Sequence, residues 1–319
     1  MSLLDITGLS HSYGDSRLYS DSDLSLNRGE HMGIVGQNGT GKSTLIKICT
    51  EQVIPDSGRV VWQPGITIGY LDQYACTNHV LTMEQFLKSS FRSLYELEAK
   101  INRLYDEAAL SCNMEVLNQA SLFQDQLERS GFYSIDTHIA QVVSGLGLVS
   151  IGLSRPLKDM SQGQRAKVIL AKLLLEKPDV LLLDEPLGAL DLQLRRQMQL
   201  ELKALQKQLG ITFIYITHDQ EEALNMSDRI AVMKDGRFEQ LGTPAEVYDS
   251  PRTSYVARFV GTANVLTGTV EAVEDDVLKV ACAGGCAGAL RRGYSFAPGA
   301  PITLAVRSEH VEFTKDPAA

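Results

Sequence analysis

Between residues 82 and 130, the apolar positions of this chain recur with the period of a helix. Spacings of three and four residues line these side chains up on one face. The first run of this apolar stripe consists of Leu87, Leu94, Leu97, Ile101, Leu104 and Ala108. The second run, after a break at residues 111–113, consists of Val116, Ala120, Phe123 and Leu127. The pattern predicts an antiparallel helical hairpin that ends at Gly131, a residue type common at helix ends.

Continuous apolar runs predict buried strands elsewhere in the chain. Val180–Leu183 and Ile211–Ile216 have the composition of central parallel strands that are covered on both faces. Met32–Val35 predicts another buried strand, and a glycine-rich loop and a helix from about Lys42 follow it. Residues 229–241 read as a β-hairpin around a central Asp-Gly turn. These patterns predict an α/β fold.

The change in sequence texture along the chain predicts two domains. We expect the main domain to span residues 1–245, with the helical insert at about 82–130. After Gly261, alternating Val and Leu positions with interspersed Gly and Pro predict a small β-rich domain at 261–319. Residues 246–260 would connect the two domains. A chain of 319 residues is long enough for this division.

Composition narrows the possible partners and the compartment. The formal net charge of −9 argues against sequence-independent binding to nucleic acid, which needs a basic surface. The apolar runs are too short to span a membrane, and residues 1–5 lack the basic start of a signal peptide. The five cysteines form no framework, and Cys282 and Cys286 lack nearby His or Cys for a metal site. We therefore expect a soluble protein with reduced thiols in the cytoplasm.

Residues 36–43 match the phosphate-binding pattern GxxxxGK[ST]. Its glycines let backbone N–H groups close around phosphates, and the start of the next helix adds a partial positive charge. Lys42 supplies a full positive charge, and the Ser43 hydroxyl is suited to bind Mg²⁺. The alternative is a chance glycine-rich turn, but the predicted strand before it and helix after it favour a nucleotide site.

An acidic pair follows the buried run at residues 180–183. Ligands of open α/β sheets bind at the carboxyl ends of the strands, where Asp184 and Glu185 would lie. Asp184 is suited to hold Mg²⁺, and Glu185 to orient and deprotonate the attacking water. Two acids after a strand are also common as an ordinary helix cap, so the assignment depends on the phosphate loop.

In their order along the chain, these motifs resemble an ATP-binding cassette (ABC) nucleotide-binding domain over about residues 1–250. Residues 160–164, Met-Ser-Gln-Gly-Gln, are similar to the family's LSGGQ motif, with Gln162 in place of the first glycine. In the family, this motif caps the γ-phosphate held by the opposite subunit. The resemblance therefore implies ATP as ligand, a homodimer on ATP binding, and contacts from Ser161, Gly163 and Gln164.

The resemblance also implies roles for residues that no local pattern singles out. Tyr13 matches the aromatic residue that stacks on adenine, although a core tyrosine is the alternative. Gln73 matches the glutamine that contacts Mg²⁺ and water, Asp191 the loop that crosses the dimer interface, and His218 the switch histidine at the γ-phosphate. The implied nucleotide-binding residues of the loop are Gly36, Asn38, Gly39, Gly41, Lys42, Ser43 and Thr44. The implied magnesium ligands are Ser43, Gln73 and Asp184, and the implied catalytic residues are Glu185, His218 and Gln73.

The fold that this family implies is a P-loop NTPase of ABC type. It would carry an antiparallel β subdomain, a helical subdomain with the hairpin, and a small C-terminal OB-like regulatory domain. Within the family, residues 1–185 are similar to the first cassette of ABC-F proteins, which act on ribosomes. Residues 184–319 are similar to the ATPase subunits of spermidine/putrescine-type importers. We interpret this as two lineages joined near residues 184–191.

Three functions remain open at the level of sequence. The favoured one is the ATPase subunit of a polyamine importer, bound to integral membrane permease subunits at the inner face of the cell membrane. The second is a ribosome-associated translation or antibiotic-protection factor. Residues 81–130 hold five basic and eight acidic residues, which argues against insertion into ribosomal RNA. The third is a chimeric ATPase without a coupled partner.

Overall fold

The structure is a computed structural model that describes residues 2–14, 16–71, 81–111, 113–186, 188, 192–290 and 295–310. The chain forms two compact units, each assembled from separate stretches of sequence. The first unit comprises Met1–Asp5, Leu24–His31 and Val60–Ile216. The second unit comprises Ile6–Asp23, Met32–Arg59 and Thr217–Ala319.

A three-stranded sheet near the N-terminus has the order β2-β1-β4. Its strands are β1 (Ser2–Tyr13), β2 (Ser16–Asn27) and β4 (Ser57–Trp62). Both long strands alternate between buried and exposed positions over much of their length, so that one face of each joins a core. Asp21, with a φ angle of 50°, lies inside β2 without ending the strand.

The parallel sheet of the first unit is built from the apolar runs. It has the order β5-β6-β7, with β5 (Ile68–Leu71), β6 (Val180–Asp184) and β7 (Thr212–Thr217). Every residue of β6 and β7 is buried, which confirms the two strands predicted from their continuous hydrophobicity. The Asp179 carboxylate, just before β6, accepts hydrogen bonds from Thr67 N and Arg28 Nη1, which lower its pKa.

Helices make up most of the rest of the first unit. The α-helices are α2 (Met83–Lys88), α3 (Arg92–Ser111), α4 (Met114–Arg129), α5 (Ile135–Gly145), α6 (Gln162–Leu175) and α7 (Leu192–Leu209). Short 3₁₀ turns are η1 (Ser89–Phe91), η2 (Phe132–Ser134), η3 (Val149–Ile151) and η4 (Leu157–Asp159). Helix α2 packs against α5 and α6, and its Met83 and Leu87 are fully buried.

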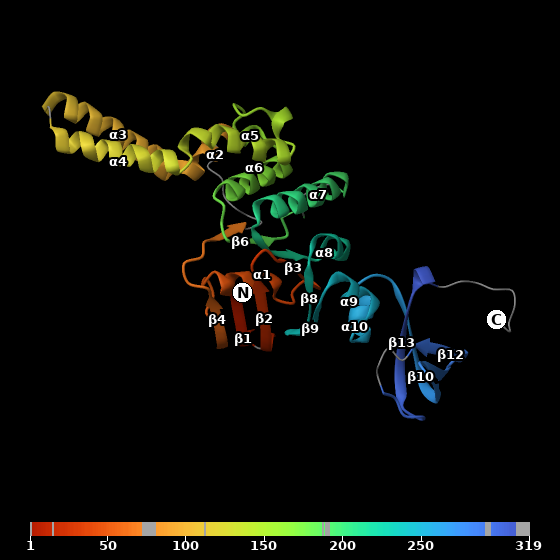
Figure 1. The fold of residues 1–319 in the computed structure, drawn as a ribbon. Helices are drawn as coiled ribbons and strands as arrows, with labels where there is room; N and C mark the ends of the chain where they lie inside the picture. The colour runs from red at the N-terminus through yellow and green to blue at the C-terminus, as the bar shows by residue number, and fades with distance from the viewer. Residues whose placement is uncertain are drawn as a thin grey trace. The chain divides into compact units, whose positions relative to one another are not determined.

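Helices α3 and α4 run side by side as the predicted antiparallel hairpin (Figure 1). The stripe at the centre of the hairpin is buried at Ile101, Ala108, Ala120 and Leu127. Asn113 caps the start of α4, since its side chain accepts a hydrogen bond from Glu115 N at 2.9 Å. The two helices of the hairpin therefore bury their apolar stripe against each other.

The second unit contains a parallel strand pair, an antiparallel hairpin and short helices. Strand β3 (His31–Gly36) pairs in parallel with β8 (Arg229–Lys234), which pairs antiparallel with β9 (Arg237–Gly242) as the predicted hairpin. The helices are α1 (Lys42–Cys49), α8 (Gln220–Met226), α9 (Pro244–Asp249) and α10 (Ser254–Phe259). Val247 of α9 and Val256 of α10 share one buried cluster with Val35 and Val232.

A four-stranded antiparallel sheet follows α10, in the order β12-β11-β10-β13. Its strands are β10 (Ala263–Glu274), β11 (Val277–Cys282), β12 (Gly285–Leu290) and β13 (Pro301–Arg307), and η5 (Ser308–His310) comes after them. Val270, Leu278 and Val280 form its small core. Within the described ranges, no helix is both long and apolar enough to span a membrane.

Candidate functional site

The glycine-rich loop joins the buried strand β3 to helix α1, as the motif requires. Gly39 and Gly41 have φ angles of 83° and 97°, in the left-handed region that favours glycine. A Cβ atom at Gly36 would lie 2.8 Å from the carbonyl oxygen of Met233, so a side chain there would collide with β8. These three glycines therefore shape the loop, and the prediction of a helix from Lys42 is confirmed.

Lys42 is 6% exposed, and its amino group lies within the curve of the loop. Nζ donates hydrogen bonds to the carbonyl oxygens of Gly36 at 3.0 Å and Gln37 at 3.1 Å. The first turn of α1 contains no acidic residue. A buried cation, backbone held open by glycines and the positive end of a helix together fit an anionic phosphate group.

Tyr19 supports the same loop, although no sequence pattern singled it out. Its hydroxyl donates a hydrogen bond to the carbonyl oxygen of Gly41, and its side chain is fully buried. Burial raises the pKa of the Tyr19 hydroxyl, which keeps it protonated as a donor. Tyr19 therefore fixes the residue that immediately precedes Lys42.

Tyr13, at the end of β1 in the same unit, is 51% exposed. Its ring meets His11 edge to face, with 4.8 Å between the ring centroids. His11 is buried and lies 3.5 Å from a carboxylate oxygen of Asp56. A half-exposed ring does not behave as a core tyrosine, so that alternative loses its support, and adenine stacking stays a prediction.

The acidic pair lies in the first unit at the carboxyl end of β6. Asp184 is the last residue of the strand and is 7% exposed. Glu185 follows with a φ angle of 44°, a left-handed conformation that is costly for a residue with a side chain. Its N–H donates to the carbonyl oxygen of Ile216 at 3.0 Å, which holds the backbone in this conformation.

The residues that resemble the LSGGQ motif start helix α6 in the first unit. Ser161 is the N-cap and forms a capping box with Gln164. Ser161 Oγ accepts from Gln164 N at 3.2 Å, and Gln164 Oε1 accepts from Ser161 N at 3.0 Å. The two side chains act only as acceptors in this cap, so the Ser161 hydroxyl and the side-chain NH₂ of Gln164 can still donate to a phosphate.

His218 lies between strand β7 and helix α8, and its side chain is exposed. The structure thus describes the phosphate loop, Tyr13 and His218 in the second unit, and Ser161 and the acidic pair in the first. Gln73 and Asp191 lie outside the described residues. Among those described, no group of three or more His, Cys, Asp and Glu is arranged to hold a metal ion on its own. The magnesium ligands therefore remain a prediction.

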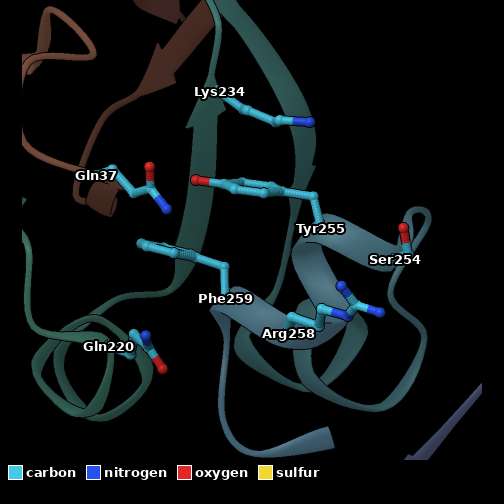
Figure 2. A pocket seen from close by; sticks show the side chains of 7 residues that line it. All are labelled: Gln37, Gln220, Lys234, Ser254, Tyr255, Arg258 and Phe259. Carbon is cyan, nitrogen blue, oxygen red and sulfur yellow. The ribbon is translucent and has the colours of Figure 1, made fainter. Parts of the chain in front are cut away.

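A cavity of about 390 Å³ lies beside the phosphate loop in the second unit (Figure 2). It is lined by Gln37, Gln220, Lys234, Ser254, Tyr255, Arg258 and Phe259. Four of these residues come from Ser254–Phe259, a segment that the sequence marked only as a connection. The threonine caps of α9 and α10, Thr243 and Thr253, were the available signal for these two helices.

The loop between a buried strand and a helix, with a buried lysine inside it, defines a P-loop nucleotide-binding protein. Residues 19–188 match the family described as ABC transporter. The chain belongs to this family and is an ABC-type ATPase that binds ATP.

The curated relatives include importer subunits. The chain is 37% identical over 312 residues to the spermidine/putrescine import ATP-binding protein PotA of Methylococcus capsulatus, covering 98% of this chain and 74% of that protein. It is 37% identical to PotA of Rubrobacter xylanophilus, covering 93% and 72%. An uncharacterized ABC transporter ATP-binding protein of Bacillus subtilis, YfmM, is 40% identical over 223 residues, covering 69% of this chain and 42% of that protein.

Solved structures of the same family share the fold. An ATP-binding cassette of an ABC transporter in its ADP conformation, MJ1267, has a TM-score of 0.56 at 21% identity, covering 80% of this chain and 98% of that one. CbiO1 from Clostridium perfringens, part of the ABC transporter complex cbiONQ, has a TM-score of 0.56 at 25% identity, covering 81% and 93%. These likenesses confirm the predicted fold class.

Proposed function

We propose that this chain is the ATP-hydrolysing subunit of a polyamine importer. The observation that carries the proposal is the 37% identity to a spermidine/putrescine import ATP-binding protein over 98% of this chain. A match of this length runs through the phosphate loop, the acidic pair and the C-terminal sheet. It therefore supports a shared coupling role in addition to a shared ATP site.

In the proposed site, the residues of the glycine-rich loop bind the phosphates and the acidic pair acts in hydrolysis. Lys42 and the N–H groups at the start of α1 would bind the β- and γ-phosphates, and Tyr13 would stack on adenine. Ser43, Asp184 and Gln73 would hold Mg²⁺, which when bound neutralises charge on the phosphates. Glu185 would accept a proton from the attacking water.

The proposed site is completed by a second copy of the chain. Ser161, Gly163 and Gln164 would donate hydrogen bonds to the γ-phosphate bound by the other subunit, and Asp191 would lie at the interface. His218 would contact the same phosphate from the subunit that binds it. Closure of two subunits on two ATP molecules would then push on permease subunits at the inner face of the cell membrane.

Uptake of labelled spermidine tests the transport role. Cells that lack polyamine import would express the chain together with the permease and binding-protein genes of a spermidine/putrescine importer. We expect ATP-dependent uptake that the Glu185→Gln variant abolishes, because that variant loses the base that prepares water. An active ATPase that gives no uptake with any such permease would contradict the importer role.

A ribosome-associated ATPase is the second candidate, and one observation favours it. The observation is the antiparallel hairpin of α3 and α4, which resembles an ABC-F arm. Cosedimentation of the Glu185→Gln variant with ribosomes in MgATP, absent in ADP, would favour this candidate. A chimeric ATPase without a partner would give hydrolysis and neither of the other results.

A further inference from the structure

The segment around His218 is fixed at both ends by hydrogen bonds. Thr217 is buried, and its hydroxyl donates to a Glu222 carboxylate oxygen at 2.6 Å. Asp219 N donates to the Thr217 hydroxyl oxygen at 3.0 Å. The Asp219 carboxylate caps α8 by accepting from the N–H groups of Glu221 and Glu222. The position of the His218 backbone therefore depends on where the start of α8 lies.

Gln220 ties the start of α8 to the end of α10. Its Oε1 accepts a hydrogen bond from the N–H of Gly261 at 2.9 Å. Gly261 has a φ angle of 80°, and a Cβ atom there would lie 2.7 Å from the Tyr248 ring. No other residue fits this position without strain, so the direction of the Gly261 N–H is set by the glycine conformation.

Arg307 of β13 fixes the end of α10 from the other side. It is 7% exposed, and its Nη1 donates to the carbonyl oxygens of Ala257 at 2.8 Å and Val260 at 2.6 Å. Nε donates to the carbonyl oxygen of Tyr248 at 3.1 Å, and the guanidinium lies 4.1 Å from the centre of the Tyr248 ring. A cation at the carboxyl ends of α9 and α10 is favourable, because these ends carry unpaired carbonyl groups.

Packing alone does not hold the Gln220 side chain. Gln220 borders the cavity that also contains Gln37 of the phosphate loop (Figure 2). The rings of Tyr255 and Phe259 stack at 5.4 Å on the α10 side of this cavity. Because space is open on one side, the hydrogen bond to Gly261 selects the position of Gln220 among its rotamers.

We propose that Gln220 is a positioning residue for His218. Its hydrogen bond to Gly261 holds the segment around His218 against the end of α10, and Arg307 anchors that end. The inference rests on the proposed ATPase site, in which His218 contacts the γ-phosphate. The proposed site assigns Gln220 no contact with the nucleotide. Its loss should therefore slow hydrolysis and leave ATP binding unchanged.

A matched pair of variants at Gln220 tests the proposal. Gln220→Met keeps the length of the side chain and removes the acceptor, whereas Gln220→Glu keeps an acceptor oxygen. For Gln220→Met we expect kcat for ATP hydrolysis to fall by about 3- to 10-fold, the worth of one hydrogen bond, with KM and melting temperature unchanged. Gln220→Glu should restore most of the wild-type kcat. Gln119→Met, at an exposed position of α4, is the control for the substitution itself.

A second test uses Arg307→Met, which removes the hydrogen bonds that hold the end of α10. Because Gln220 and Arg307 would act through the same connection, the double variant Gln220→Met/Arg307→Met should lose no more kcat than the more severe single variant. Wild-type kcat in Gln220→Met, or equal losses in Gln220→Met and Gln220→Glu, would overturn the proposal. If Arg307→Met lowers the melting temperature, the Gln220 pair decides alone. A wild-type chain without ATPase activity would overturn the proposed function itself.

Discussion

Lys42 contributes both to the shape of the phosphate loop and to its charge. Its amino group donates hydrogen bonds to two carbonyl oxygens of the loop. Its positive charge therefore lies within the segment that is predicted to bind phosphate. Lys42→Ala should weaken ATP binding by roughly 10- to 100-fold, as expected for losing a hydrogen bond to a charged group. Titration with a fluorescent ATP analogue measures this loss.

Lys47→Ala is the control for that experiment, because Lys47 lies on the last turn of the same helix and is exposed. It removes an equal charge from the second unit without touching the loop. Equal affinities of Lys42→Ala and the wild type would mean that the glycine-rich loop does not bind phosphate.

Tyr13 should act through its ring face. Tyr13→Ala should lower ATP affinity by about 1–3 kcal/mol, the usual worth of stacking on a base. Because the ring is 51% exposed, the melting temperature should stay close to that of the wild type. Tyr13→Phe keeps the ring and should bind normally. Isothermal titration of the three proteins distinguishes these outcomes, and a destabilised Tyr13→Ala with normal affinity would assign the ring to the core.

At the scale of elements, the hairpin should be separable from catalysis. Residues 99–124 can be replaced by a short Gly/Ser linker, which retains the buried helix α2 and the contact of Tyr95 with Phe132 at the base. Since α3 and α4 bury their stripe against each other, we expect the shortened chain to fold and to keep its basal ATPase rate. Circular dichroism and phosphate release measure both properties.

A wider deletion from Met83 is the informative contrast. Met83 and Leu87 of α2 are fully buried, and α2 packs against α5 and α6. Removing α2 as well should destabilise the first unit by several kcal/mol, as for other losses of large buried side chains. Unfolding of the shorter deletion, on the other hand, would show that the hairpin supports the rest of the unit.

The same elements show what the sequence could predict. The seven-residue period of Leu94, Ile101 and Ala108 marks a helix face that is buried against the neighbouring helix of the hairpin. Both helices and the break between them could therefore be predicted from the sequence. Leu87 continues that period and yet belongs to α2, which turns away through η1. A regular spacing does not reveal where a helix bends, because the bend depends on packing against α5 and α6, which are distant in sequence.

The candidate site also contains residues that the sequence predicts and residues that only the structure identifies. The glycines, Lys42 and the acidic pair follow from a local pattern that carries its own chemistry. Tyr19 and Arg307 do not, since each bonds to main-chain atoms of a remote segment, Gly41 and the ends of α9 and α10. Any donor of the right reach could make such contacts, and only the tertiary arrangement selects these two.

At the scale of the whole molecule, ATP should control association. Glu185→Gln keeps the size of the side chain and removes the base, so hydrolysis should fall by roughly 10²- to 10⁴-fold while binding survives. The variant should elute as a dimer in MgATP and as a monomer in ADP. Size-exclusion chromatography with light scattering measures the mass.

Adding Ser161→Arg should abolish that dimer. Arginine at the N-cap of α6 removes the hydroxyl and adds bulk where the other subunit's phosphate would bind. A Glu185→Gln chain that stays monomeric at saturating MgATP would contradict the two-subunit site. Full hydrolysis by the same variant would remove Glu185 from catalysis and leave His218 as the next candidate.

Strand β3, which leads into the phosphate loop, has β8 as its parallel neighbour, with Gly36 in register with Met233. The ribosome synthesises these two residues far apart in time. At roughly 5–20 residues per second, the stretch between them takes on the order of 10 to 40 seconds to make. During that interval β3 lacks the strand against which Gly36 packs. The nascent chain therefore completes its ATP-binding loop only after Met233 has been made.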